Sequence, residues 1–247
     1  MARVIVAVGG GKRTLPIDRE IVRLANKKSP TLLLIPTASS DSEQYWSRAQ
    51  QYYGEFLKCK TDVLLLIKDQ PSRQQMGRKI SSADIIYVPG GNTLLMMRVW
   101  RRLGVDRLLK AAYERGTVMA GMSAGSICWF ESGHSDSMSF YQPRKWKYIN
   151  VRGLGLLKGI HCPHYNGMTL GIPRRNHFQA MILKTGGIGI AIENNCAVEF
   201  IDGQFYKVIS SRSDAHAYRV HKSLGKVVVE RLPQTNRPVP VESLYCW

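Results

Sequence analysis

The sequence lacks cysteine pairs and long apolar runs. Its five cysteines are scattered and form no CxxC motif, which argues against a zinc site and against a disulfide framework. We therefore expect reduced thiols, no bound metal and a cytoplasmic location. No apolar stretch reaches the ~18 to 20 residues of a membrane-spanning helix, so we expect no contact with a membrane. The cysteines are Cys59, Cys128, Cys162, Cys196 and Cys246.

Acidic residues are also scarce. The chain has 18 acidic against 35 basic residues and a formal charge of +17. Such an excess is compatible with nucleic-acid binding. The basic residues are spread from Arg3 to Arg237 without a dense block, however, and no helix-turn-helix, zinc-finger or RNA-binding signature is present. Nucleic acid is therefore the less favoured partner, and the positive field suits a small acidic substrate equally well.

The composition is that of a globular protein, with 44% hydrophobic and 21% charged residues in 247. Short runs that are apolar on both faces alternate with amphipathic stretches, which is typical of buried parallel strands joined by helices. This pattern predicts an α/β fold in which helices cover both faces of a mostly parallel sheet, giving three layers. The expected strands are Arg3–Val8, Thr31–Ile35, Asp62–Ile67, Asp84–Val88 and Thr117–Ala120, and the expected helices are Pro16–Lys28, Asp41–Lys58 (with Asp41 as N-cap), Ser72–Ile80 and Thr93–Arg115 with a break near Gly104.

The last third of the chain has a different pattern. Asp202-Gly203 between two apolar runs predicts a tight hairpin, so we expect the sheet to end in antiparallel strands. No linker divides the chain, which indicates a single domain over residues 1–233 and an extended tail over 234–247. The expected elements are strands at Leu156–Pro163, Ile188–Ile192, Ala197–Ile201, Gln204–Ile209 and Lys226–Leu232, and a helix at Pro173–Lys184.

One motif indicates nucleophilic catalysis. Residues 121–125 fit G-x-S-x-G, and they stand between the strand that ends at Ala120 and an expected helical stretch, Ala124–Phe130. A sharp strand-to-helix turn of this kind exposes the hydroxyl of its serine above the sheet, and small neighbours let a substrate approach. Ser123 is therefore the candidate nucleophile.

A serine nucleophile needs a base, which is usually a histidine held by a third polar group. His164 is favoured because it follows the strand that ends at Pro163, and active sites of open α/β sheets form at the carboxyl ends of strands. His134, in the loop after the nucleophile, is the second choice. The orienting acid is Glu193, after another strand end, or Asp136, near Ser123 in sequence.

Two further glycine clusters are candidates for an oxyanion-binding loop and for a nucleotide-binding loop. The backbone amides of Pro89-Gly90-Gly91-Asn92-Thr93, which follow a strand, could hold an oxyanion together with the amide of Ala124. Gly9-Gly10-Gly11 lacks the GxGxxG spacing of a dinucleotide site, and Gly11-Lys12 lacks the upstream glycine of a P-loop. We expect no nucleotide cofactor.

Taken together, four motifs resemble peptidase E, the aspartyl dipeptidases of serine peptidase family S51. The resemblance extends to about Ser211, and the stretch that follows Ser123 is similar to the forms found in Gram-positive bacteria. The motifs, in chain order, are Ile35-Pro36-Thr37-Ala38, Val88-Pro89-Gly90-Gly91-Asn92-Thr93, Gly121-Met122-Ser123-Ala124-Gly125 and Pro163-His164-Tyr165-Asn166.

The resemblance implies a fold like the class I glutamine amidotransferases, which is flavodoxin-like, and hydrolysis of dipeptides with an N-terminal aspartate. It implies no metal or cofactor. Ser123 would be the nucleophile and His164 the base, with Gly91 and Ala124 as oxyanion donors. For the third member of the catalytic triad, the acid that orients His164, the family offers two positions. Glu193 matches the glutamate of the related cyanophycinases and is favoured, and Asp136 matches the alternative.

The resemblance also implies an arginine for the aspartate side chain, because a guanidinium binds a carboxylate with two hydrogen bonds. Arg174 is the closer match and Arg175 is adjacent. Asp136 could bind the substrate ammonium if it is not the orienting acid.

Two alternatives to the dipeptidase stay open, and the molecule is expected to be a monomer or a homodimer. One alternative is cyanophycinase-like release of β-Asp-Arg, and the other is a non-catalytic basic protein that binds nucleic acid on the same fold.

Overall fold

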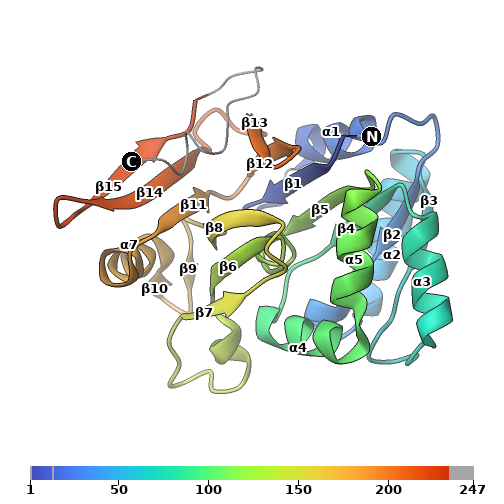
Figure 1. Cartoon of the computed structure of the whole chain (residues 1–247), viewed down its shortest axis with the longest axis horizontal. Coiled ribbons are helices and arrows are strands. Elements are labelled where there is room, and N and C mark those ends of the chain that lie inside the picture. The colour runs from blue at the N-terminus through green and yellow to red at the C-terminus, as the bar shows by residue number, and fades with distance from the viewer. Residues whose placement is uncertain (1, 13, 234–247) are drawn as a thin grey trace.

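The computed structural model describes residues 2–12 and 14–233 (Figure 1). The expected tail over 234–247 lies outside the described residues, as does Cys246; the other four cysteines are buried and free. Among the described helices, none is long and apolar enough to cross a membrane.

The first sheet has seven strands in the order β13-β12-β1-β5-β4-β2-β3. The five strands from β1 to β3 in this order are parallel, and β12 and β13 are added antiparallel at the other edge. The mostly parallel α/β fold is thus confirmed. The strands are β1 (Val4–Val8), β2 (Thr31–Leu34), β3 (Lys60–Val63), β4 (Ile85–Val88), β5 (Val118–Met122), β12 (Cys196–Ile201) and β13 (Gln204–Ser210).

Side chains alternate between the two faces of this sheet, as the strand period requires. Val6 packs on one face with Ile21 of α1, whereas Ala7 belongs to the core on the other face with Met76 of α3 and Trp100 of α4. Helices therefore cover both faces (Figure 1). The helices are α1 (Leu15–Leu24), α2 (Glu43–Ala49) continued by the π-helical turn η2 (Gln50–Phe56), α3 (Arg73–Ser82), α4 (Thr93–Leu103), α5 (Val105–Glu114), α6 (Ala124–Ile127) and α7 (Arg174–Thr185), with short 3-10 turns η1 (Pro36–Ser39) and η3 (Ser137–Phe140).

The late strands do not all extend the first sheet, which corrects the expected topology. Six strands form a second sheet in the order β15-β14-β11-β8-β6-β7, in which β6, β8 and β11 are parallel. Its outer face is covered by α7 through Phe178 and Ile182. The strands are β6 (Phe130–Ser135), β7 (Ile149–Arg152), β8 (Leu157–Cys162), β11 (Ile188–Ile192), β14 (Ala217–Ser223) and β15 (Lys226–Arg231), and a separate hairpin joins β9 (Met168–Thr169) to β10 (Ile172–Pro173).

Local signals identified two turns correctly. Gly104 separates α4 from α5, as expected. Its φ of 72° is in the left-handed region, which glycine adopts readily. Asp202 and Gly203, with φ of 52° and 76°, form the two-residue turn between the antiparallel strands β12 and β13.

Three local predictions were wrong, and two of them concern the chain around Asp41 and β3. The expected N-cap Asp41 is instead buried, and its carboxylate accepts hydrogen bonds from the backbone of Ile67 and Lys68 at 2.6 and 3.0 Å, while Ser42 is the residue that precedes α2. The strand β3 ends at Val63 rather than at the expected Ile67, and the Asp41 contact holds the turn that follows it.

The expected helix Ala124–Phe130 ends at Ile127, and β6 begins at Phe130. The polar sequence of β6 gives little strand signal, and its pairing with β7 and β8 decides its conformation.

Candidate functional site

Ser123 occupies a strained turn between β5 and α6. Its φ of 58° and ψ of −114° are rare for a residue with a side chain. Glycines make the turn possible: a Cβ on Gly125 would lie 1.8 Å from the carbonyl oxygen of Val88, and one on Gly121 would lie 2.2 Å from the carbonyl oxygen of Gly125. The geometry is that of a nucleophile elbow, which presents the serine hydroxyl at the end of the sheet.

The loop after β4 lies beside this turn because β4 and β5 are neighbours in the sheet. A Cβ on Gly90 would lie 3.2 Å from the Cβ of Ser123. Gly91 has a φ of 142°, and a side chain there would meet the carbonyl oxygen of Ala38 at 2.2 Å. The backbone of Gly91 and that of Ala124, the first residue of α6, therefore flank Ser123.

His164 comes from the second sheet and meets Ser123 at the end of β1. The amide of Ser123 donates to the carbonyl of Val8 at 3.1 Å, and the amide of His164 donates to the next carbonyl, that of Gly9, at 3.0 Å. Gly10 is essential to this arrangement, since a Cβ there would lie 2.2 Å from the imidazole of His164. Within the described part of the chain, the hydroxyl of Ser123 and the imidazole form no hydrogen bond, a contact that often tightens only when substrate binds.

The partner of the imidazole is Asn194, which the sequence analysis did not identify. His164 Nδ1 lies 2.6 Å from Asn194 Oδ1. The orientation of that amide follows from Asn166, whose Oδ1 accepts from the backbone amide of Asn194 at 3.0 Å. Because Asn166 Oδ1 is an acceptor, the Asn194 side-chain atom that lies 3.1 Å from it is the donor Nδ2.

The Oδ1 of Asn194 therefore faces His164 and accepts the Nδ1 proton. The tautomer is thereby fixed, because a neutral imidazole that carries its proton on Nδ1 has a lone pair on Nε2. Burial lowers the pKa of His164 from its ordinary value of 6.5, and the charge of Arg174 lowers it further. The imidazole is thus a neutral base at physiological pH.

Glu193, the favoured orienting acid, does not contact His164 in the described hydrogen bonds. Its carboxylate accepts from the backbone amide of His216 at 3.0 Å and from Arg175 at 3.2 Å. Glu193 and Asn194 follow β11 directly, so consecutive side chains point in different directions. Glu193 faces β14, and Asn194 faces His164.

Asp136, the alternative acid, is also not the partner of His164. It pairs with Arg174, and its Oδ2 accepts from the hydroxyl of Thr169 at 2.9 Å. Arg174 is only 2% exposed, donates to the carbonyl of His134 at 3.3 Å and stacks over the ring of Tyr148.

Each candidate arginine thus neutralises one of the candidate acids. Both members of the Arg174–Asp136 pair are close enough to His164 to influence its pKa: Arg174 lowers it and Asp136 raises it. Arg175 is half exposed and lies over the ring of Tyr165 while it pairs with Glu193. The Arg174–Asp136 pair is the one that affects the pKa of His164, and its arginine is far more buried than Arg175.

The second-choice base, His134, is buried, and its described contacts are with residues other than Ser123. Its Nε2 lies 2.9 Å from Nδ1 of His177, and its ring stacks on Tyr148. Burial lowers its pKa to about 2, so the imidazole stays neutral. His161 lies inside β8, and its ring bonds with the hydroxyl of Ser126 and the carbonyl of Ile190, both at 2.8 Å.

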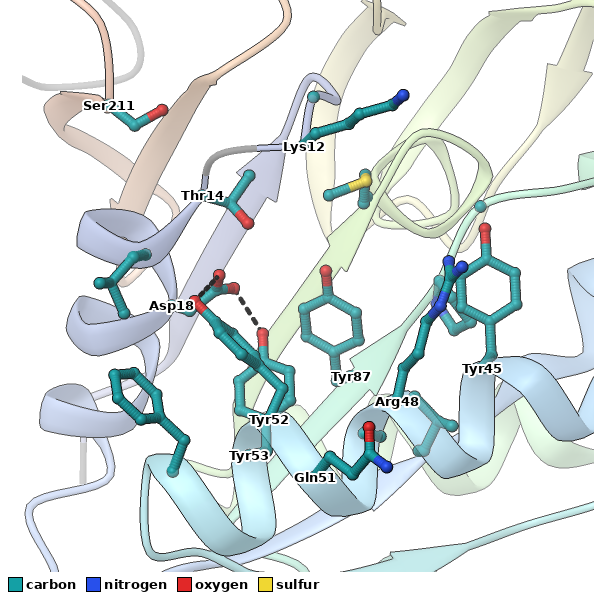
Figure 2. A pocket seen from close by; sticks show the side chains of 18 of the residues that line it. Lys12, Thr14, Asp18, Tyr45, Arg48, Gln51, Tyr52, Tyr53, Tyr87 and Ser211 are labelled. Atoms are coloured by element: carbon teal, nitrogen blue, oxygen red, sulfur yellow. Dashed lines mark hydrogen bonds between the residues drawn. The ribbon is translucent and has the colours of Figure 1, made fainter.

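A pocket of about 990 Å³ opens next to the serine turn (Figure 2). Pro89 and Gly90 line it on one side of the nucleophile loop, and Met122 precedes Ser123. The rest of the wall comes mainly from α1, α2 and η2, and Tyr87 of β4 and Lys12 also line the pocket. Among the described residues, no group of three or more His, Cys, Asp or Glu side chains is arranged to hold a metal ion.

Comparison with known proteins assigns the family. The model of peptidase family S51 matches residues 5–208, most of the chain. The chain belongs to peptidase family S51. Membership establishes a hydrolase of the protease class, and the expected resemblance to this family is confirmed.

Relatives and solved structures agree with the S51 assignment. The uncharacterized peptidase YgaJ of Bacillus subtilis is 35% identical over 237 residues, which cover 93% of this chain and 96% of YgaJ. The uncharacterized peptidase Lin0382 of Listeria innocua is 27% identical over 154 residues, covering 58% of this chain and 68% of Lin0382.

Two solved structures share the fold. A peptidase from an acI-B1 Actinobacterium has a TM-score of 0.71 at 18% identity and covers 97% of both chains. A putative peptidase E protein from Listeria monocytogenes has a TM-score of 0.59 at 20% identity and covers 94% of this chain and all of that one.

Proposed function

We propose that this S51 peptidase is a serine-type dipeptidase that hydrolyses dipeptides with an N-terminal aspartate, Asp-X. The observation that carries the proposal is the arrangement at the end of β1. There Ser123 and His164 are held on consecutive carbonyls, and Asn194 leaves the Nε2 lone pair of His164 free. Ser123 attacks the peptide carbonyl while His164 Nε2 takes its proton.

The remaining groups complete the reaction. The amides of Gly91 and Ala124 stabilise the oxyanion of the tetrahedral intermediate. The leaving amine takes the proton back from His164, and the aspartyl group stays on Ser123 as an ester. Water then hydrolyses the ester by the same steps, and free enzyme is regenerated. Asn194 is the third member of this triad, in the position that Asn takes in some cysteine peptidases.

The buried pair of Arg174 and Asp136 supports specificity for aspartate. An N-terminal aspartyl residue carries a side-chain carboxylate and an α-ammonium group, and this pair offers one partner for each. Arg174 binds the carboxylate because its guanidinium is preorganised by His134 and Tyr148. Asp136 is part exposed and binds the ammonium group.

The test of this proposal is a comparison of Asp-Leu, Asn-Leu and Glu-Leu with a chelator present. Asn-Leu has almost the shape of Asp-Leu without its charge, so we expect kcat/KM for Asp-Leu to be at least about tenfold higher. Glu-Leu, longer by one methylene, is expected to be about tenfold poorer as well. Release of leucine measures all three rates. Equal rates on Asn-Leu and Asp-Leu would contradict recognition of the carboxylate, and exclusive cleavage of β-Asp-Arg polymer would support the cyanophycinase alternative.

The pH dependence tests His164 as the base. A protonated imidazole cannot accept the proton of Ser123, so kcat/KM falls as the pH decreases through the pKa of His164. Burial and Arg174 disfavour the imidazolium, and the acid limb is therefore expected below the ordinary value of 6.5. Initial rates on Asp-Leu between about pH 4 and 8 measure this limb. A profile that stays flat until the protein unfolds would rule out a histidine base.

A further inference from the structure

The pocket beside Ser123 lies on the opposite flank of the nucleophile from the Arg174–Asp136 pair. Met122 belongs to the core on the face covered by α1 and α2, whereas His164 and Arg174 come from the second sheet and α7. Gly90 joins the two regions, since it lines the pocket and also lies against Ser123. A dipeptide with its scissile carbonyl at Ser123 would place one residue on each flank.

The walls of the pocket are aromatic and held in place by a buried carboxylate. Asp18 is 2% exposed, and it accepts from the hydroxyls of Tyr53 at 2.5 Å and Tyr52 at 3.2 Å. Tyr87 packs against Tyr53 with ring centroids 5.3 Å apart. The tyrosines therefore form a fixed surface suited to an apolar side chain, and the volume is ample for a small ligand.

Two basic side chains stand at the rim of this pocket. Arg48 and Lys12 are exposed, and among the residues that the structure describes neither has a hydrogen-bonded or ion-paired partner. Figure 2 shows Arg48 rising from α2 beside Tyr45, on the far side of Tyr87 from Asp18. The pocket thus has a buried carboxylate at one side and, at the other, a guanidinium that no described side chain pairs with.

We propose that this pocket binds the residue that leaves in the reaction, with its side chain among the tyrosines and its terminal carboxylate on Arg48. This inference rests on the proposed function. The tyrosine wall suits an apolar side chain, and the acidic residue goes to Arg174 on the other flank. A longer peptide would present a neutral peptide bond to Arg48 instead of a carboxylate. The charge at the rim therefore selects dipeptides.

The experiment compares Asp-Leu with its C-terminal amide, Asp-Leu-NH₂, for wild type, Arg48→Gln and Arg78→Gln. Arg78 is exposed on α3 and does not line the pocket, so it provides the same loss of charge elsewhere. We expect wild type to prefer the free acid by about tenfold in kcat/KM. Arg48→Gln raises KM for Asp-Leu about tenfold, changes kcat by less than about twofold and leaves the amide unaffected. Arg78→Gln matches wild type on both substrates.

A binding measurement keeps the result independent of the proposed function. Titration calorimetry with L-leucine and L-leucinamide uses the protein with Ser123→Ala, with and without Arg48→Gln. We expect leucine to bind at least about tenfold more tightly than leucinamide, and Arg48→Gln to remove the difference.

The two failures are distinguishable. Cleavage of Asp-Leu that is insensitive to Arg48→Gln overturns the pocket assignment and leaves the dipeptidase intact. If no Asp-X peptide is cleaved, the proposed function fails and the titration decides the pocket: loss of leucine binding in Arg48→Gln supports it, and binding that is absent or unchanged overturns it.

Discussion

Ser123→Ala is expected to lower kcat for Asp-Leu by at least about 10⁴-fold, because alanine removes the atom that forms the acyl-enzyme. The backbone should be unaffected. Alanine fits wherever serine fits, and the unusual φ of 58° is held by contacts of the main chain: the amide of Ser123 donates to Val8, and its carbonyl accepts from Ser126 and Ile127.

The measurement is leucine release, with urea unfolding as a check that the variant retains its stability. Ser81→Ala, an exposed serine on α3, provides a matched control that should behave as wild type. A fluorophosphonate should label wild type and not Ser123→Ala. Residual activity within about tenfold of wild type would mean that another group is the nucleophile.

Asn194→Ala is expected to lower kcat/KM by about 10²- to 10³-fold, while Glu193→Gln stays within a few fold of wild type. Without the Oδ1 of Asn194, His164 loses the acceptor that keeps its proton on Nδ1, and its ring is free to take the wrong tautomer. Glu193 bonds instead with Arg175 and the backbone of His216, which a glutamine can still accept from.

The variant Asn194→Asp tests whether Asn194 acts by orienting the imidazole of His164 or only by stabilising the fold. A carboxylate accepts the same Nδ1 proton and also stabilises the imidazolium, so activity should return and the acid limb of kcat/KM should move to higher pH. The pH profiles of all three variants with Asp-Leu provide the readout. A large loss in Glu193→Gln together with a small one in Asn194→Ala would restore Glu193 as the orienting acid.

Much of the fold follows from local signals in the sequence. Apolar runs predicted the parallel strands. Gly104 and Asp202-Gly203 predicted turns, and all three residues have a positive φ. The strand β6 was missed because Glu131, Ser132 and His134 carry no apolar pattern. Its conformation comes from pairing with β7 and β8, which are distant in sequence. The position of Asp41 was missed for a similar reason, since its partners are the backbone amides of Ile67 and Lys68.

The candidate site was predictable to the extent that strand ends determine it. Ser123 and His164 each follow a buried strand, and the structure brings their backbones together on β1. The choice between Glu193 and Asn194 was not predictable from the pattern, because the two are adjacent and only the direction of each side chain distinguishes them. Two asparagines next to each other after a buried strand were the signal, and Asn166 is the residue that gives the first of them its orientation.

The sequence by itself determined the α/β class, the serine turn and the family resemblance, because each depends on residues that are close in the chain. Tertiary structure alone decided that the late strands form a second sheet, that each candidate arginine pairs with a candidate acid, and that a tyrosine-lined pocket adjoins the serine. These features join residues far apart in sequence, and their geometry is set by strand register and packing, which no local pattern encodes.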